Sequence, residues 1–191
     1  MTDEKPLNVL TICGSLRKGS LNAAVTRALP GLAPAGMTMI AAPPFDRFPL
    51  YNADVQREDG FPEPVTALAE VVRAADAVII VSPEYNYSIP GALKNALDWV
   101  SRMPDQPFKG KPVALQSAAP GPLGGSRAQY HMRQVMIFLE ALVFGRPEVF
   151  VSFAQQRVNE AGELHDEATR KVIAAQLEGF AAYIRRHGGK G

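Results

Sequence analysis

Near the amino end of the chain, four side chains that can donate hydrogen bonds to an anion fall within eight residues. The stretch GSLRKGSLN, at positions 14–22, supplies Ser15, Arg17, Ser20 and Asn22. Hydroxyl, amide and guanidinium groups bind phosphate oxygens, and glycine lets a backbone approach an anion closely. We therefore interpret the stretch as a phosphate-binding loop. A glycine-rich turn that carries solvated bases is the alternative.

The segments on either side decide whether these donors can converge. The run from Leu7 to Ile12 is mostly apolar and partly β-branched, which is typical of a buried parallel strand. From Leu21 to Leu29, apolar residues recur at helical spacing, and Ser20 is a suitable N-cap. A strand that leads into a helix leaves backbone N–H groups unpaired beside the positive end of the helix dipole. The junction therefore favours an anion.

This loop differs from the two common nucleotide-binding loops. It has the G-x-x-x-x-G spacing of a nucleoside triphosphate loop, but Lys18 precedes the second glycine instead of following it. The apolar run Val78–Val81 also leads into Ser82 rather than into an aspartate that could hold magnesium. No G-x-G-x-x-G follows the first strand, so a dinucleotide site of the Rossmann type is poorly supported. A phosphate monoester bound without metal, such as that of FMN, fits better.

A second group of functional residues, Pro83 to Tyr87, follows the apolar run Ala77–Val81. A flat heteroaromatic ring needs apolar or aromatic faces and a few donors and acceptors at its edge, and PEYNY supplies both. Backbone N–H groups around Tyr85 to Tyr87 are suitable donors to ring carbonyls. Packing of both tyrosines against the following helix is the alternative. A phosphate loop in the same chain favours ring binding.

The rest of the chain alternates between strand and helix patterns. Further strands are predicted at Met37–Ala42, Val113–Ser117 and Val149–Phe153. Helices are predicted at Val65–Ala75, from Ile89 to Val100, along a buried stripe from Met132 to Val143, and from about Asp166 to Gly188. Positions 43–64 read as a long irregular loop, with apolar and aromatic residues that either cover a pocket, meet a second subunit or cap the sheet edge.

This alternation predicts an α/β fold with a five-stranded parallel sheet and helices on both faces. The flavodoxin-like strand order 2-1-3-4-5 is the usual arrangement of such a sheet. In that order the first and third strands are neighbours, so their carboxyl ends meet. We therefore expect the phosphate loop and the PEYNY loop to border one crevice.

Composition and charge exclude several functions. The chain has 191 residues, which predicts a single domain over 1–191, and its net charge is +1 with acids and bases interspersed. We therefore expect neither nucleic acid nor a membrane as partner. Cys13 is the only cysteine, which favours a reducing, cytoplasmic location, and we expect it to be a small core residue. The three histidines lack metal-ligand spacing, so no metal is expected.

Two motifs together resemble a known family. They are GSxRxxSxN from Gly14 to Asn22 and PEYNYSxPGxLKNxxDW from Pro83 to Trp99. The chain is similar in these motifs to the NADPH-dependent FMN reductases, and more closely to the bacterial chromate and quinone reductases of that family. The segments Pro49-Leu50-Tyr51 and Gly124-Gly125-x-Arg127 extend the resemblance to nearly the whole chain.

The resemblance implies bound FMN, hydride uptake from NADPH or NADH, and transfer to quinones, free flavins, azo compounds or metal oxyanions such as chromate. It places the FMN phosphate at Ser15, Leu16, Arg17, Ser20, Leu21 and Asn22. It places the ring at Pro83, Glu84, Tyr85, Asn86 and Tyr87, with Ser117 and the following loop at the other edge of the ring. It also implies a homodimer or homotetramer, with the flavin near the subunit interface.

Because hydride chemistry belongs to the cofactor, we expect no catalytic nucleophile or essential acid in the chain, and ping-pong kinetics. The alternative is a flavodoxin-type electron carrier without its own nicotinamide site, although such carriers are usually strongly acidic. The sequence leaves two roles open for Arg102, Arg127 and Arg133. They either bind the extra phosphate of NADPH or form salt bridges at a subunit contact.

Overall fold

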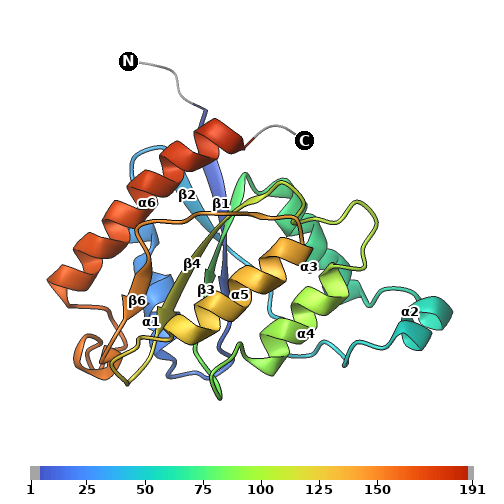
Figure 1. Cartoon of the computed structure of the whole chain (residues 1–191), viewed down its shortest axis with the longest axis horizontal. Coiled ribbons are helices and arrows are strands. Elements are labelled where there is room, and N and C mark those ends of the chain that lie inside the picture. The colour runs from blue at the N-terminus through green and yellow to red at the C-terminus, as the bar shows by residue number, and fades with distance from the viewer. Residues whose placement is uncertain (1–4, 189–191) are drawn as a thin grey trace.

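The computed structural model describes residues 5–188, and these contain one parallel sheet (Figure 1). Strands β2, β1, β3 and β4 are neighbours in that order, and both β5 and β6 pair with β4. The strands are β1 (Leu7–Cys13), β2 (Met37–Ala41), β3 (Ala77–Val81), β4 (Pro112–Ala118), β5 (Leu142–Val143) and β6 (Val149–Val151). The predicted α/β class and the order 2-1-3-4-5 are therefore confirmed.

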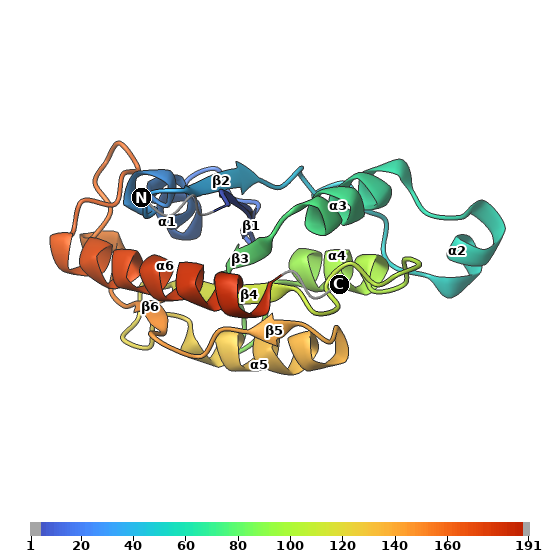
Figure 2. The ribbon, with the colours of Figure 1, turned by 90° about the horizontal axis from the view of Figure 1, so that it is seen from above.

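Helices cover both faces of this sheet. They are α1 (Leu21–Ala28), α2 (Ala53–Asp59), α3 (Glu63–Ala74), α4 (Gly91–Val100), α5 (Ser126–Phe138) and α6 (Glu167–His187). Residues of α1 and α6 belong to one core cluster, and residues of α3, α4 and α5 belong to the other. Figure 2 shows α1 and α6 on one side of the sheet and α3 and α4 on the other.

The central strands are apolar throughout because both of their faces are covered. Every residue of β3 is buried. Val78 and Ile80 point into the core under α3, α4 and α5, whereas Ile79 points into the core under α1 and α6. Side chains alternate between the faces of a strand, so an uninterrupted run of β-branched residues supplies both cores at once.

Two predicted elements near the end of α5 are corrected. The predicted helix continues through Leu142 and Val143, but α5 ends at Phe138, and Glu140 has a positive φ of 52°. Leu142 and Val143 instead form β5, in register with Pro112 and Val113. Helical spacing of apolar residues does not distinguish the last turn of a helix from a short strand that is buried against the same core. The sheet consequently has six strands among the described residues, not five.

The long segment after β2 is also more ordered than predicted. It contains α2, which buries none of its residues and lies at one end of the molecule in both ribbon views (Figures 1 and 2). The segment is attached to α4 through Trp99, which is fully buried and donates from Nε1 to the Pro49 carbonyl at 2.8 Å. Tyr51 contacts the Trp99 ring edge-on, at 5.1 Å between ring centroids. Trp99 therefore has a packing role.

Candidate cofactor site

The phosphate loop and the PEYNY loop are neighbours, as predicted. Cys13 at the end of β1 is in register with Val81 at the end of β3, and the Gly14 N–H donates to the Val81 carbonyl at 2.8 Å. A Cβ on Gly14 would lie 2.8 Å from Leu93 Cδ2 and 2.9 Å from Ser82 Oγ. Glycine is therefore required here by close approach, and this contact holds the starts of the two loops together.

The loop between β1 and α1 has unpaired backbone donors. Ser20 is the N-cap of α1, as predicted, and its hydroxyl accepts from the Ala23 N–H at 3.3 Å. Within residues 5–188, no hydrogen bond takes up the backbone N–H groups of Leu16, Arg17, Leu21 or Asn22. These donors lie in the loop and in the first turn of α1, beside the positive end of the helix dipole. The arrangement suits an anion.

The side chains of this loop divide into two kinds. Leu16 and Arg17 are exposed and Ser15 is half-buried. The Asn22 amide, by contrast, is buried and is engaged by β4: Nδ2 donates to the Ala118 carbonyl, and Oδ1 accepts from the Ala118 N–H, both at 2.9 Å. Asn22 therefore contributes a backbone N–H to the loop, while its side chain anchors α1 to the sheet.

The PEYNY loop contains a tight turn. The Tyr85 N–H donates to the Ser88 carbonyl at 2.9 Å, and the Ser88 N–H donates to the Tyr85 carbonyl at 3.0 Å. Between them, Asn86 and Tyr87 have positive φ values of 50° and 67°, the pattern of a type I′ turn. Left-handed backbone in non-glycine residues costs on the order of 1 kcal/mol each and is concentrated at functional sites. The side chains of Tyr85 and Tyr87 are exposed.

Glu84 and Arg127 join this loop to α5. The Glu84 carboxylate accepts from Arg127 Nε at 2.6 Å and from Arg127 Nη2 at 2.5 Å. The same guanidinium lies over the Tyr87 ring, 3.7 Å from its centroid. The hydrogen bond from Glu84 raises the pKa of Arg127 above its ordinary value. The sequence left two roles open for Arg127, a contact to NADPH or a salt bridge between subunits. In the structure, Arg127 forms its ion pair with Glu84 of the same chain.

The other two arginines left open by the sequence also have partners within the chain. Arg133 pairs with Glu148 at 3.4 Å, and Arg102 lies over the rings of Tyr51 and Phe138. The Ser88 side chain does not cap the next helix. Helix α4 begins at Gly91 with Pro90 as its N-cap, and the Ser88 hydroxyl lies 3.0 Å from His131 Nδ1. Proline at this position moves the helix start past the serine.

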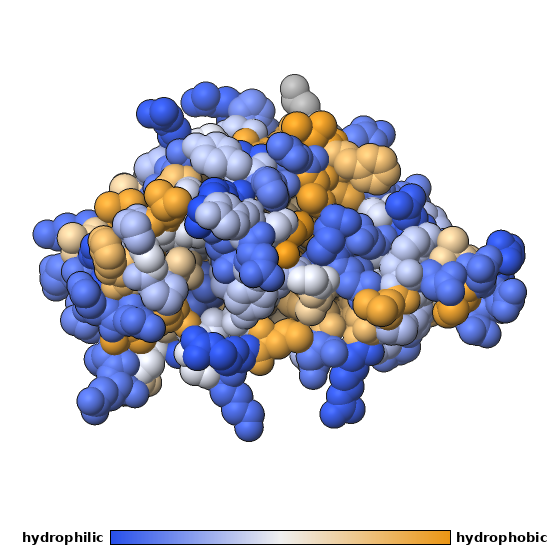
Figure 3. Space-filling model, turned by 60° about the horizontal axis from the view of Figure 1, so that its bottom comes forward, coloured by the Kyte–Doolittle hydropathy of each residue, from blue (hydrophilic) through white to orange (hydrophobic). Residues whose placement is uncertain are grey.

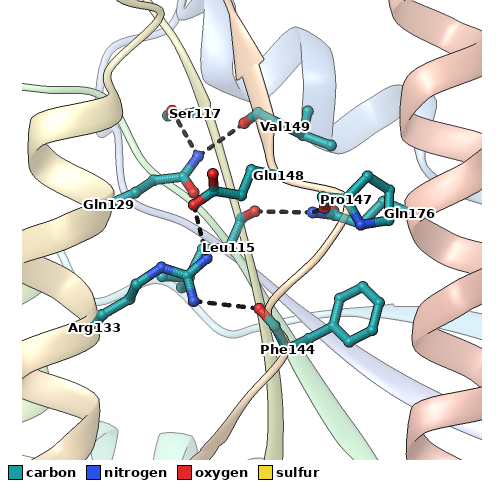
Figure 4. Close-up of polar contacts among 9 residues, drawn as sticks. All are labelled: Leu115, Ser117, Gln129, Arg133, Phe144, Pro147, Glu148, Val149 and Gln176. Carbon is teal, nitrogen blue, oxygen red and sulfur yellow. Dashed lines mark hydrogen bonds and ion pairs between the residues drawn. The ribbon is translucent and has the colours of Figure 1, made fainter.

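Ser117 is fully buried, and its hydroxyl is engaged within the chain. It donates to the Gly124 carbonyl at 2.6 Å and accepts from Gln129 Nε2 at 2.8 Å, which also donates to the Val149 carbonyl (Figure 4). The Ser117 side chain thus fastens the glycine loop that precedes α5. Gln129, which sequence reasoning missed, is the residue that completes this contact.

The loops lie at the carboxyl edge of the sheet. Figure 3 turns the lower side of Figure 1 toward the viewer and shows hydrophilic side chains beside separate hydrophobic patches. A hollow of about 470 Å³ borders the PEYNY loop at Ser88, between α4 and α5, and includes Lys94 and His131. Another of about 590 Å³ lies between α1 and the segment before α6 and contains none of the loop residues.

Residues 5–188 contain neither a metal-binding cluster nor a membrane-spanning helix. No group of three or more His, Cys, Asp or Glu side chains is placed to hold a metal ion. No helix among these residues is long and apolar enough to cross a membrane. Cys13 is half-buried at the end of β1, and its Sγ lies 3.7 Å from the Ser15 carbonyl oxygen.

Comparison with known proteins identifies the family of this chain. The model of the NADPH-dependent FMN reductase family matches residues 7–156, which include both loops. The chain belongs to this family. The reductase is therefore an oxidoreductase, its cofactor is FMN, and NAD(P)H is its hydride donor.

Relatives of the reductase agree with this assignment. A quinone reductase of Escherichia coli K12 is 52% identical over 181 residues, covering 94% of this chain and 96% of the relative. An NAD(P)H-dependent FMN reductase of Pseudomonas aeruginosa is 46% identical over 186 residues, covering 97% and 98%. The structure of FerB, a flavoenzyme NAD(P)H:(acceptor) oxidoreductase of Paracoccus denitrificans, superposes with a TM-score of 0.85 at 32% identity, covering 96% of this chain and 100% of FerB.

The described residues fit FMN. Free backbone N–H groups at the start of α1 suit a phosphate, and the exposed Arg17 adds a positive charge. Next to them, the left-handed turn at Asn86 and Tyr87 presents N–H groups that no hydrogen bond within residues 5–188 takes up. Such donors suit the carbonyls at the edge of a flavin ring.

Proposed function

We propose that this reductase transfers hydride from NADPH or NADH to quinones in a ping-pong cycle, with both substrates using the same exposed region beside the PEYNY loop. The observation that carries the proposal is the juxtaposition of two sets of free backbone donors. One set lies at the start of α1 and the other in the Tyr85–Ser88 turn, and Gly14 holds the two loops together. The name of the Escherichia coli relative, quinone reductase, supports quinones as acceptors.

The chain's own residues bind and orient the cofactor. Bound FMN supplies the acceptance and donation of hydride. We assign the phosphate to the backbone of residues 15–22, with the Ser15 hydroxyl and the Arg17 guanidinium as side-chain donors. We assign the ring to the backbone of residues 83–87 and to the exposed tyrosine side chains. Ser117 and the Asn22 amide act indirectly, by fixing the glycine loop and α1 to β4.

A wider range of acceptors is also proposed. Free flavins, azo compounds and oxyanions such as chromate differ in shape and charge from quinones. A site formed by two surface loops and exposed tyrosines selects weakly among planar or small acceptors. The electron-carrier alternative has less support, because the three relatives described above are named reductases or oxidoreductases. A cytoplasmic location and a single domain over 1–191 stay predictions.

We further propose a homodimer or homotetramer that brings the cofactor site near a subunit contact. The carboxyl-terminal end of α5 exposes Ile137 and Phe138 with 75% and 69% of their surface in solvent. Tyr130, on the same helix, is also exposed. Helix α5 begins beside the PEYNY loop, where Arg127 contacts Glu84. A second copy on α5 would therefore lie close to the ring-binding turn.

The test is an anaerobic titration of the purified protein followed by its visible absorbance. We expect a flavin spectrum that bleaches with NADPH or NADH and returns when benzoquinone is added. Parallel initial-rate lines at several quinone concentrations would support the ping-pong cycle. A flavin spectrum that neither nicotinamide bleaches would favour the carrier. Absence of a flavin spectrum after incubation with FMN would overturn the proposal.

A further inference from the structure

Helix α5 cannot be capped by its own N-cap residue. That residue is Gly125, which has a positive φ of 86° and no side chain. A Cβ at this position would lie 2.8 Å from Ser117 Cβ and 3.0 Å from Ser117 Oγ. Because the buried Ser117 has no room to move away, serine, threonine or aspartate cannot replace the glycine. The Ser126 N–H donates to the Leu123 carbonyl at 3.0 Å, but the N–H groups of Arg127 and Ala128 lack the partner that an N-cap side chain would provide.

Glu84 supplies this partner from the loop after β3. Its carboxylate accepts from the Ala128 N–H at 3.3 Å, and Ala128 is the third residue of the helix. A local N-cap side chain would bond the N–H of the second or third helical residue, so Glu84 occupies the position of a cap. The carboxylate also lies at the positive end of the helix dipole and pairs with Arg127. Only 9% of its side chain is exposed.

The same contacts bracket the ring-binding turn. Glu84 directly precedes Tyr85, the first residue of the turn, and Tyr87 inside the turn lies under the Arg127 guanidinium. Both sides of the left-handed pair Asn86 and Tyr87 are thus attached to the first turn of α5. The left-handed conformation of Asn86 and Tyr87 costs free energy on its own. The start of α5 holds it in place, and the Glu84 carboxylate in turn caps the start of α5.

We propose that Glu84 is a positioning residue, whose carboxylate caps α5 from another loop and thereby fixes the Tyr85–Ser88 turn before the cofactor binds. This rests on the proposed function only for the statement that the turn holds the flavin ring. The carboxylate is not a ligand of the ring in this scheme, because Arg127 and Ala128 already occupy it. The turn and the start of α5 form one cooperative unit.

The experiment compares wild type with Glu84→Gln, which keeps an acceptor for Ala128 but removes the charge that binds Arg127. In the full-length chain without FMN, the hydrogen-bonded amides of the turn, at Tyr85 and Ser88, should exchange faster together with those of Ser126 and Ala128. FMN should bind about tenfold more weakly, because the neutral amide loses both the ion pair with Arg127 and the favourable position of a negative charge at the helix dipole. The affinity for inorganic phosphate, measured by the amide signals of residues 16–22, should not change.

Asp98→Asn is the matched control. It removes the same charge from an ion pair with Lys94 at 2.6 Å on α4, the helix that follows the turn. This variant should leave exchange in residues 85–88 and FMN affinity as in wild type. A similar effect of both variants would mean that general charge loss, and not the cap, is responsible, and would overturn the inference.

Two further outcomes separate this inference from the proposed function. If Glu84→Gln loosens residues 126–128 but leaves residues 85–88 protected, the turn does not depend on the cap and the inference fails. A fall in phosphate affinity equal to the fall in FMN affinity would likewise overturn it, since the effect would then extend beyond the turn. If wild type binds no FMN, the proposed function fails, whereas joint loosening in the exchange experiment still supports the coupling.

Discussion

At the scale of single residues, two side chains expected in the site, Asn22 from its type and Ser117 from the family resemblance, are engaged within the chain. The Asn22 amide bonds Ala118 in both directions, and the Ser117 hydroxyl bonds the Gly124 carbonyl and the Gln129 side chain. An amide or a hydroxyl is equally suited to a ligand and to a buried peptide group. The sequence therefore predicts both residues for the site, but the partners of their side chains depend on the fold.

Replacing Asn22 by alanine tests this distinction. The change leaves the buried N–H and carbonyl of Ala118 without their partner, so we expect a loss of roughly 2 kcal/mol in the free energy of unfolding. Urea denaturation measures this loss, and Asn159→Ala, in an exposed loop, serves as the control. If the variant is as stable as wild type but has lost its FMN affinity, the Asn22 side chain binds the phosphate and this interpretation is wrong.

At the scale of elements, prediction succeeded for the buried strand β3 and the start of α1, and failed at the boundary between α5 and β5. The buried run Ala77–Val81 and the start of α1 at its Ser20 cap are as predicted. The boundary between α5 and β5 was missed, because it depends on the positive φ of Glu140 and on pairing with β4. Tertiary pairing decides such short segments, and no local pattern records it.

Helix α6 provides a prediction about pH. Its N-cap, Asp166, accepts from the hydroxyl and the N–H of Thr169 and from Arg157, and these contacts lower the pKa of the carboxyl to about 2. An unfolded aspartate titrates near its ordinary value of 3.8. The cap therefore stabilises the folded chain fully above that pH, and its contribution is lost as the pH falls toward 2.

Thermal unfolding between pH 5 and pH 2, about the span of this titration, checks the prediction. Wild type should lose stability more steeply than Asp166→Asn, which cannot ionise, and the two curves should converge at the acid end. Glu167→Gln, a change at the next residue, should follow wild type. Parallel curves for wild type and Asp166→Asn would show that the cap does not contribute through its charge.

At the scale of the whole molecule, the strand order and the adjacency of the two loops could be predicted, because alternating strands and helices permit few arrangements. The side-chain contacts that fix the two loops could not be predicted, because they join residues far apart in the chain. Glu84 and Arg127 are separated by 43 positions, and Asn22 and Ala118 by 96. The need for glycine at position 14 could not be predicted either, because it depends on the close approach of Ser82 and Leu93.

The exposed end of α5 gives a prediction about assembly. Ile137→Lys with Phe138→Lys should shift the protein from an oligomer to a monomer, because two charges would enter the proposed contact. Light scattering coupled to gel filtration measures the mass. Val172→Lys, at an exposed apolar position on α6, is the control. A wild-type monomer, or a double variant of unchanged mass, would contradict the proposed contact.

Two short strands, β5 and β6, form the edge of the sheet beside β4, and their length affects whether another chain can add a strand there. Beside β4, the sheet ends in strands of two and three residues, and the segment between them is held by Gln176, which donates to the Pro147 carbonyl at 2.7 Å. A long, regular edge would present a row of free peptide groups on which a second chain could add its own strand. This edge offers too short a ladder for such growth. Strand addition at this edge, and fibril growth through it, are therefore disfavoured.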